Sequence, residues 1–352
     1  MRFLVIILFL QASVFVAVAS EEVHHTTEKH EATTTEADDS KSFIAHHVKD
    51  SYDFGIWHAM GWEFPLPIIL IDNGLHVFSS GKFHHGDAVA ASKGNYYKIF
   101  HGKIYKTDAK GTITLDEHHH VTNAMPLDFS ITKTVVSIMF MVLLMFVVFA
   151  RIARSYKNGA LPKNGGKFLE PLIIFVRDEI AIPNIGEHQY KKYMSHLLTV
   201  FFFIWFSNLA GLLPLGINVT GNIAVTFSLA IVTFLITQFT AKKNYWKHVF
   251  WMPGVPVPMK FILAPIELLG VFIKPFALMI RLYANILAGH IVLMSLVALL
   301  YVFSNWFAKG AFLGLTFFLS ILELLVAFLQ AYIFTMLTAL YFGAASAQHE
   351  EH

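Results

Sequence analysis

Five apolar segments follow residue 127 and constrain this chain more than any other feature. The first three are each close to the ~20 residues that a helix needs to cross the hydrocarbon core of a bilayer. Lipid offers backbone amides no hydrogen-bond partners, so apolar segments of this length satisfy them internally as helices. The segments cover residues 130–150, 194–214, 222–240, 261–303 and 311–343. Only 14% of the residues are charged, against about 25% in soluble domains. We therefore predict an all-α polytopic membrane protein with five transmembrane helices.

The last two segments are too long for upright spans. At 1.5 Å per residue, 261–303 and 311–343 would reach roughly 64 and 50 Å, against a hydrocarbon core of about 30 Å. We expect a long, strongly tilted C-terminal helical hairpin with its outside turn near residues 304 to 310. A break near Lys274-Pro275 is the alternative, and the extra crossing would then place the C-terminus outside.

The chain before the spans has the composition of an exported segment. Arg2, an apolar run and small residues precede Glu21-Glu22, as in a cleaved export signal, and an uncleaved anchor helix is the alternative. The following tail lacks the apolar periodicity that would offset the entropy of ordering it. We divide the chain into a signal peptide (1–20), a disordered His- and acid-rich tail (21–50), an exported β-rich module (51–127), a membrane domain (128–345) and a cytoplasmic tail (346–352).

Strand-like runs and turn signals predict the small β-rich module. Residues 66–70 lead into Asp72-Asn73-Gly74, and residues 97–100 lead into His101-Gly102, which is the pattern of β-hairpins. Runs such as His118-His119-His120 leave metal binding open, although they lack a fixed ligand spacing. The chain has no Cys, which excludes disulfides, thiol catalysis and Cys-based zinc sites.

Loop charges orient the spans. Eight Lys and Arg residues lie between 151 and 192, and three Lys residues lie between 242 and 247. The predicted outside loops, 215–221 and 304–310, together hold one basic residue. The positive-inside rule therefore places the C-terminus in the cytoplasm and the β-rich module outside. Residues 168–182 alternate apolar and charged positions and are expected to form a short interfacial helix.

Arg281 lies inside the fourth apolar segment, where a guanidinium is expensive to place and stays charged. Counting residues from the hairpin turn pairs Arg281 in depth with Gln330, and His290 with Glu323. Helical rise separates these two polar layers by about 10 to 13 Å. At about 100° per residue, His290 projects from the face opposite Arg281. Glu267 lies near the inner end of the same helix. The charged residues therefore differ both in their depth in the membrane and in the face of the helix from which they project.

This arrangement suits proton transfer by two separate half-paths. His290 with Glu323 would load protons from the outside, and Glu267 would serve an inner exit. Arg281 cannot release its proton, so it prevents direct hopping between the two paths. It does attract a carboxylate that another subunit carries past it. Transport then requires that moving partner.

Motifs in the last two segments are similar to those of a known family. They are Pro265-Ile266-Glu267, Lys274-Pro275, Arg281-Leu282-Tyr283-Ala284-Asn285, Ala288-Gly289, Leu329-Gln330-Ala331-Tyr332-Ile333-Phe334 and Leu337-Thr338, with Asn208-Leu209-Ala210-Gly211-Leu212-Leu213-Pro214 earlier in the chain. Over about residues 128 to 345 the chain resembles subunit a of F-type ATP synthases, the membrane stator that faces the rotating c-ring. His290 precedes the acid at Glu323, the reverse of the order in several bacterial relatives, and Ala277 stands where many relatives have Ser.

The resemblance implies a proton-channel stator with no catalytic site and no cofactor of its own. It implies that Arg281 is the essential stator arginine, that Gln330 and Asn285 support it, and that His290 with Glu323 line the outer half-channel. The implied partners are the c-ring rotor, b-type peripheral stalk subunits, the remainder of the complex and the lipid bilayer. The export signal favours a bacterial inner membrane.

Other interpretations stay open. Arg281 could snorkel or form a structural ion pair, His290 and Glu323 could be a structural pair, and Asn285 with Gln330 could be an interhelical contact. An independent secondary transporter is the alternative function, although no pair of broken helices repeats in the two halves. An intramembrane hydrolase would need an HExxH or GxSxG signature, and an ATP site a GxxxxGK[ST] loop, none of which occurs. Basic residues fall between the apolar segments, which argues against nucleic-acid binding.

Overall fold

The structure, a computed structural model, describes residues 50–57, 62–86, 88–116, 120–157, 166–212, 218–252, 255–302 and 305–346. The described residues form two compact units, one within 50–140 together with residue 218 and one within 141–212 and 219–346. Several predictions concern residues outside the described ranges: the signal peptide, the tail up to residue 49, the pair His118-His119, the motif end Leu213-Pro214 and the final residues 347–352.

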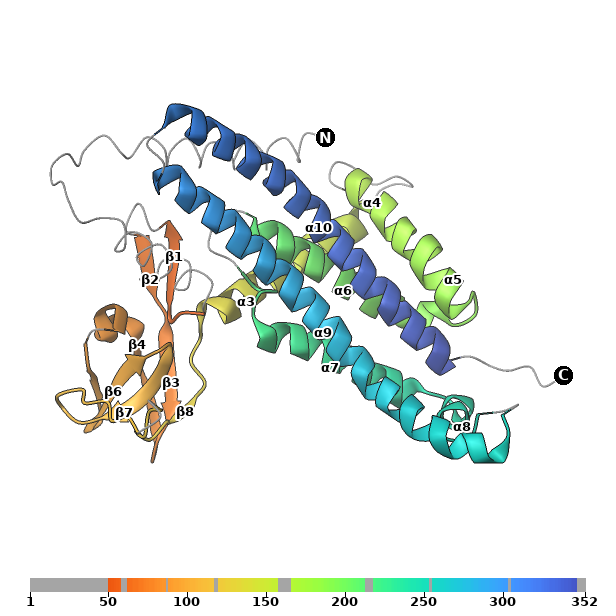
Figure 1. Ribbon diagram of the computed structural model, residues 1–352, viewed down its shortest axis with the longest axis horizontal. Helices are drawn as coiled ribbons and strands as arrows, with labels where there is room; N and C mark the ends of the chain where they lie inside the picture. The colour runs from red at the N-terminus through yellow and green to blue at the C-terminus, as the bar shows by residue number, and fades with distance from the viewer. Residues whose placement is uncertain are drawn as a thin grey trace. The chain divides into compact units, whose positions relative to one another are not determined.

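The first unit holds a β-rich module, as the sequence predicts (Figure 1). Its strands form three small antiparallel sheets, in the orders β1-β2, β4-β3-β8 and β5-β6-β7. A short 3-10 helix, η3 (Ser80–Gly86), follows β4. The strands are β1 (Asp53–Trp57), β2 (Trp62–Pro65), β3 (Pro67–Ile71), β4 (Leu75–Ser79), β5 (Ala90–Ser92), β6 (Asn95–Phe100), β7 (Lys103–Thr107) and β8 (Leu127–Asp128).

Both predicted hairpins are confirmed. β3 and β4 are joined at Asp72-Asn73-Gly74, where Asn73 has φ 51° and Gly74 has φ 146°. β6 and β7 are joined at His101-Gly102. Positive φ is cheap for Gly and tolerated by Asn, which is why these residues mark the turns. The hydrophobic core of the module consists of Ile68, Leu70, Phe78, Phe83, Ala90, Tyr97 and Ile104.

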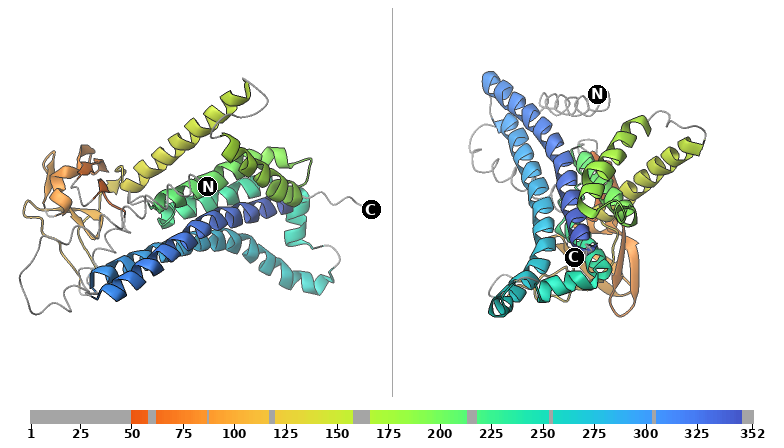
Figure 2. Two further views of the ribbon diagram at one scale, coloured as in Figure 1. Left: turned by 90° about the horizontal axis from the view of Figure 1, so that it is seen from above. Right: turned by 90° about the vertical axis from the view of Figure 1, so that its right-hand side faces the viewer.

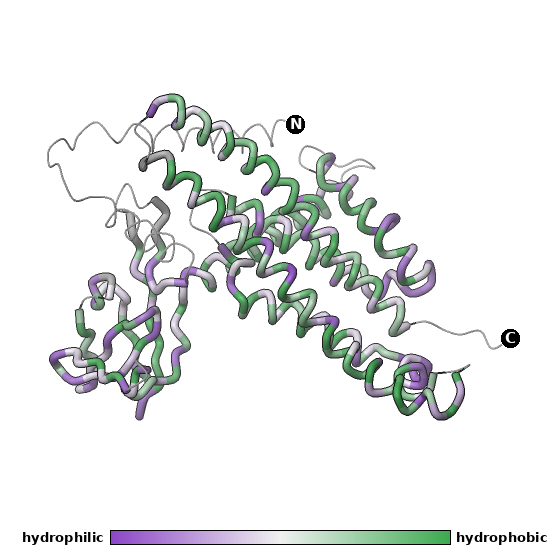
Figure 3. Tube along the Cα trace, viewed as in Figure 1, coloured by the Kyte–Doolittle hydropathy of each residue, from purple (hydrophilic) through white to green (hydrophobic). Residues whose placement is uncertain are grey.

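Five helices in the described ranges are long and apolar enough to cross a membrane, which confirms the predicted number of spans. Figure 3 shows their apolar residues interrupted by isolated polar positions. The helices are α3 (Lys133–Lys157), α6 (Tyr190–Gly211), α7 (Ile223–Thr240), α9 (Val257–Val302) and α10 (Trp306–Ser346).

α9 and α10 form the predicted long hairpin. They contain 46 and 41 residues, about 69 and 62 Å at 1.5 Å per residue, which exceeds a hydrocarbon core of about 30 Å. Helices of this length either tilt or extend beyond the core, and the strong tilt stays a prediction. α9 runs unbroken through Pro265 and Pro275, which rules out the alternative break at Lys274-Pro275. Figure 2 shows the two helices together at the turn and apart at their other ends.

The predicted turn at 304–310 is wrong in extent, because α10 begins at Trp306. Asn305 caps the helix: its Oδ1 accepts a hydrogen bond from the Phe307 N–H at 3.0 Å, and its carbonyl accepts one from the Lys309 N–H at 3.0 Å. A capping Asn satisfies amides that the first turn leaves without helical partners. The helix can therefore start before the apolar run that guided the prediction.

Two shorter helical regions connect the spans. α4 (Gly166–Phe175), the π-helical turn η4 (Val176–Ala181) and α5 (Ile182–Ile185) form one helical run. This run confirms the helix predicted over 168–182, while its interfacial placement stays a prediction. α8 (Lys243–Phe250) was not predicted, because its sequence was interpreted only as a basic loop.

α6 and α7 hold the hairpin from one side. α6 is the most buried span, with 61% of its most apolar window inside the structure. It packs against α10, where the rings of Tyr193 and Phe342 stack with centroids 4.5 Å apart. α7 packs against α9, with Phe234 and Phe272 centroids 5.9 Å apart. These contacts fix which faces of α9 and α10 remain open.

Candidate functional site

One face of α9 is open along most of its length. Leu278, Leu282 and Ile286 are buried on the opposite side of the helix. The exposed residues recur at spacings of three and four, which places them on one face. Its large apolar members are Phe261, Ile262, Ile266, Leu269, Phe272, Ile273, Phe276, Ile280, Ile291 and Val292. α7 borders this stripe, where the ring centroids of Phe234 and Phe272 are 5.9 Å apart and those of Phe227 and Phe276 are 6.4 Å apart. The members of the stripe are nevertheless exposed.

Arg281 lies in this open face, near the middle of α9, next to Ile280. No carboxylate among the described residues forms an ion pair with its guanidinium. The guanidinium does lie close enough to the Tyr341 hydroxyl of α10 to act on it electrostatically. An uncompensated cation on an apolar surface is costly in lipid. The position therefore suits a cation whose anionic partner comes from another molecule.

Asn285 and Gln330 meet one turn along from Arg281. The Asn285 amide, Nδ2, donates a hydrogen bond to Gln330 Oε1 at 3.0 Å, which joins α9 to α10. Counting residues from the turn paired Gln330 in depth with Arg281. In the structure Gln330 pairs with Asn285, which follows Arg281 by four residues on α9. The hairpin register is thus close to the predicted one, and the two amides that were expected to support Arg281 contact each other.

The structure also brings His290 and Glu323 to adjacent positions across the hairpin. A Cβ placed on Gly289 would lie 2.9 Å from Glu323 Oε1, so the carboxylate rests against the residue beside His290. No hydrogen bond links these two described side chains. His290 is half-buried, unlike exposed Arg281, in keeping with its predicted position on another face. Within the described ranges, no three His, Asp or Glu side chains could hold a metal ion together.

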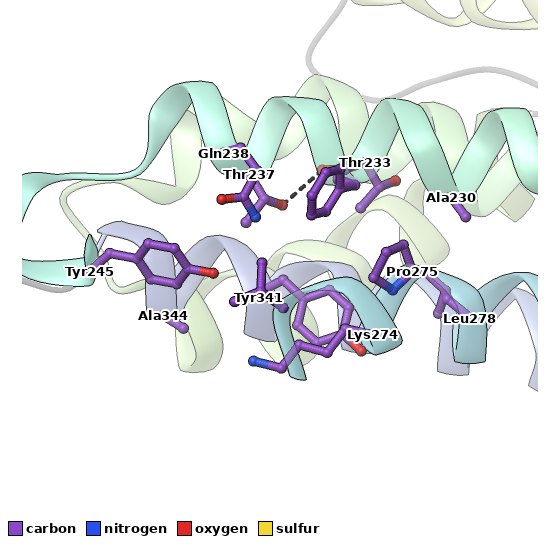
Figure 4. Close-up of a pocket in the computed structure, with 12 residues that line it drawn as sticks. Ala230, Thr233, Thr237, Gln238, Tyr245, Lys274, Pro275, Leu278, Tyr341 and Ala344 are labelled. Carbon is purple, nitrogen blue, oxygen red and sulfur yellow. Dashed lines mark hydrogen bonds between the residues drawn. The ribbon is translucent and has the colours of Figure 1, made fainter. Parts of the chain in front are cut away.

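A pocket lies where α7, α8, α9 and α10 meet, at the end of the hairpin away from its turn. Figure 4 shows Lys274, Tyr245 and Tyr341 around it. The Lys274 ammonium lies 5.7 Å from the centroid of the Tyr341 ring. The full lining is Ala230, Thr233, Phe234, Thr237, Gln238, Tyr245, Val271, Lys274, Pro275, Leu278, Tyr341 and Ala344. Lys274 and Arg281 are seven residues apart, about 20° around the helix, so they lie on the same side of α9. Lys274 lines the pocket, and Arg281 lies two turns closer to the hairpin turn, where that side is exposed.

The Glu267 carboxylate influences the ionisation of Tyr245, a residue that lines this pocket. Burial raises the pKa of Tyr245, a hydrogen bond with Gln238 lowers it, and the nearby Glu267 carboxylate raises it. The Gln238 carbonyl oxygen, Oε1, is buried and has no hydrogen-bond partner in the described structure. A buried amide oxygen without a protein partner is a typical site for an ordered water. The unpaired Gln238 oxygen is thus a position for a water in a pocket whose other lining is largely apolar.

Sequence reasoning missed the α7 and α8 side of this site. Thr226, Thr233 and Thr237 are seven and four residues apart in an apolar span, and that helical spacing could have marked a polar stripe. It also gave no role to Asn208, whose Oδ1 accepts a 2.6 Å hydrogen bond from the Thr220 hydroxyl. The Asn208 amide in turn donates to the Ala327 carbonyl of α10 at 3.4 Å. Asn208 thus tethers the middle of α10.

Comparisons with known proteins agree with this arrangement. The family model described as ATP synthase A chain matches residues 135–343, and a domain of unknown function (DUF8433) matches residues 43–129. ATP synthase subunit a of Chloroherpeton thalassium is 38% identical over 304 residues, covering 78% of this chain and 88% of that protein. ATP synthase subunit a 2 of Chlorobaculum tepidum is 44% identical over 234 residues, covering 64% and 66%. The Myxococcus xanthus subunit a is 42% identical over 232 residues, covering 64% and 76%.

The fold and the site define a multi-pass helical membrane protein whose long terminal hairpin presents a fixed cation on an open face. The chain belongs to the ATP synthase subunit a family. It is accordingly a membrane subunit of ATP synthase with a part in proton transport for ATP synthesis.

Proposed function

We propose that this chain is the proton-channel stator of an F-type ATP synthase. It would provide two half-channels to and from the carboxylates of a c-ring, and so convert downhill proton flow into rotor torque that drives ATP synthesis elsewhere in the complex. The same device can run in reverse. The observation that carries the proposal is Arg281, a permanent cation on an open apolar face with no ion-pair partner among the described residues.

The open face of α9 suits a moving helical partner. Its exposed apolar residues, such as Phe276 and Ile280, can slide along lipid-like side chains without strong directional bonds. Among the charged residues of α9 in the described structure, Arg281 is the exposed one, so it would select a carboxylate as each rotor subunit passes. Because a guanidinium does not lose its proton, it separates the two half-channels instead of joining them.

The residues around Arg281 support one half-channel on each side of it. Towards the turn of the hairpin, Asn285 with Gln330 and then Glu323 beside His290 supply polar groups for the outer path. Towards the other end, the pocket of Lys274 and Tyr341 with Glu267 nearby would form the inner path. Titratable groups inside a span are costly and therefore mark ion paths.

The partners and orientation follow from the same proposal. The c-ring would face α9, b-type peripheral stalk subunits would hold the chain against rotor torque, and the lipid bilayer would cover the remaining surface. The predicted signal peptide and the loop charges favour a bacterial inner membrane with residues 21–127 in the periplasm and the C-terminus in the cytoplasm. The chain itself would carry no catalytic site and no cofactor.

Photo-crosslinking in the whole complex tests the rotor-facing side. A benzoylphenylalanine in place of Ile280, which is 55% exposed on the open face, should capture a small carboxylate-bearing rotor subunit. The same group in place of Phe146 on α3, which is 70% exposed, should give no rotor product. Mass spectrometry of the crosslinked band identifies the captured chain.

The outcome also discriminates between functional classes. If Ile280 captures no rotor subunit while the isolated chain moves protons in vesicles, the independent-transporter alternative replaces the stator proposal. Capture of the rotor from both positions would show that crosslinking reports proximity in the membrane and not the open face of α9.

Gly289→Ala is expected to reduce ATP-driven proton pumping. The added methyl would lie 2.9 Å from Glu323 Oε1, so the carboxylate must leave its position beside His290. A side chain forced off its rotamer costs about 0.5–1.5 kcal/mol, or roughly 2- to 12-fold in rate. Gly270→Ala on the same helix is the control, because its added Cβ meets no heavy atom within 4 Å. Equal pumping by the two variants would remove the Glu323 position from the proton path.

A further inference from the structure

The β-rich module exposes one apolar sheet face. Strands β3 and β4 alternate, so that Ile68, Leu70 and Phe78 are buried on the inner side. The outer side carries Ile71 and Leu75, which are paired across the two strands. Val77 is 58% exposed on this side, and Leu127 of β8, paired with Ile71, is 65% exposed. We call Ile71, Leu75, Val77 and Leu127 the outer sheet face.

Hydrogen bonds fix this sheet to the first turn of α3. The Phe129 N–H donates to the Ile69 carbonyl at 2.9 Å, and the Ile131 N–H donates to the Pro67 carbonyl at 3.1 Å. At the start of the helix, the Thr134 N–H donates to the Asp50 carboxylate at 3.1 Å. Residues up to 140 belong to the same compact unit as the sheet. The module and the beginning of the first span therefore belong to one compact unit.

The start of α3 lies close to a membrane surface. Arg151 follows Lys133 by 18 residues, about 27 Å of helix, which nearly equals the hydrocarbon thickness of about 30 Å. With Arg151 at one boundary, Lys133 is at the other. Leu127 precedes Lys133 by six residues, so it lies within about 20 Å of that boundary even along an extended chain.

Apolar exposure continues from the sheet to the span. Phe129, between β8 and α3, is 63% exposed, and Met139 on α3 is also 63% exposed. The neighbouring acid, Asp128, is paired with Leu70, so it lies on the side away from the outer sheet face, and it accepts a 2.6 Å hydrogen bond from the Tyr52 hydroxyl. The outer sheet face and the exposed side of α3 are thus linked by exposed apolar residues.

We propose that the outer sheet face rests on the bilayer, in the headgroup and upper acyl region of the leaflet that α3 enters at Lys133. A large exposed apolar patch marks an interaction surface. Lipid is the occupant that this short, hydrogen-bonded connection to α3 brings within reach of the patch, and interfacial apolar side chains gain by leaving water there. The module would then be bound to the membrane surface at the start of the first span, and would not tumble freely.

Spin labelling tests the contact directly, because the chain has no native Cys to interfere. The variants are Val77→Cys and Leu127→Cys, each labelled with a nitroxide on the full chain in vesicles of phosphatidylethanolamine and phosphatidylglycerol. Ala91→Cys, on an exposed position of β5 in another sheet, is the control. The measurement is the collision rate of each label with oxygen, which concentrates in lipid, and with a water-soluble nickel chelate.

The expected result is several-fold more oxygen and several-fold less nickel collision at positions 77 and 127 than at position 91. Adding Val77→Glu to the Leu127→Cys chain should raise nickel collision at the label, because a charge lifts the face out of the lipid. Nickel collision at position 77 equal to that at position 91 would overturn the proposal. Protection from both reagents would also overturn it, since a second copy or another protein segment would then cover the face.

Discussion

Arg281→Ala should abolish ATP-driven acidification of inverted membrane vesicles that contain the whole complex, with the variant subunit still assembled. Arg281 is exposed on α9, and no ion pair to it exists in the described part of the chain. Its removal therefore breaks no internal ion pair that would unfold the subunit. The loss should appear in coupled transport and not in the amount of assembled protein.

The size of the effect follows from electrostatics in a medium of low polarity. A cation within about 4–6 Å favours the ionised form of a carboxylate by roughly 10- to 1,000-fold in population. Without it, a rotor carboxylate that reaches the stator keeps its proton and is not exchanged. The barrier between the two half-channels also disappears, so vesicles should become passively leaky to protons after the catalytic sector is removed.

Two variants sharpen the measurement. Arg281→Lys keeps the positive charge. It replaces the planar guanidinium, which does not lose its proton, with an ammonium that can lose a proton when it is desolvated, so pumping should remain strongly impaired. Phe146→Ala removes an exposed apolar side chain from α3, away from the open face of α9, and should pump normally. Fluorescence quenching of an acridine dye reports acidification, and immunoblotting of purified complex reports assembly. Normal pumping by an assembled Arg281→Ala complex would contradict the stator role.

The membrane fold could be predicted because its signals are local. Span length and apolar content identify each crossing without knowledge of the partner helices. The start of α10 was misplaced because a single cap at Asn305 sets it. α8 was missed because eight residues in a basic loop carry too little apolar pattern to mark a helix.

The charged and titratable residues of the candidate site could be predicted, because such side chains are costly inside an apolar span. Arg281, His290, Glu323 and Glu267 stand out in apolar runs, and counting from the turn brought Gln330 within one turn of its observed partner. The inner pocket was not predictable in this way. It is assembled by four helices, and its contributors from α7 and α8 are uncharged residues that occur in many spans.

Gly343→Ala should destabilise the subunit, whereas Gly314→Ala on the same helix should stabilise it slightly. A Cβ on Gly343 would collide with the backbone carbonyl of Asn184 in α5. Backbone cannot rotate aside as a side chain can, so α5 and α10 must separate. A Cβ on Gly314 meets no heavy atom within 4 Å.

The surroundings of Gly343 leave little room for that separation. Neighbouring Phe342 stacks on Tyr193 of α6. The Ala345 carbonyl accepts a hydrogen bond from the Lys242 N–H at 3.1 Å, and the Ser346 carbonyl accepts one from the Gln189 amide at 3.2 Å. The end of α10 is thus held by three segments at once, and a shift to admit the methyl must strain at least one of them.

Overpacking of this kind costs about 1–3 kcal/mol, while replacing Gly by Ala inside an unobstructed helix gains about 0.5–1 kcal/mol. The two variants differ by the same methyl group, so their opposite signs isolate the contact with Asn184. Thermal unfolding of the full chain in detergent gives the sign, and hydrogen exchange should rise over 182–185 in Gly343→Ala alone. Equal or greater stability of Gly343→Ala would mean that α10 does not approach α5 this closely.

Because Ala344 lines the pocket beside Lys274, the same displacement should also slow proton pumping, which Gly314→Ala should leave unchanged.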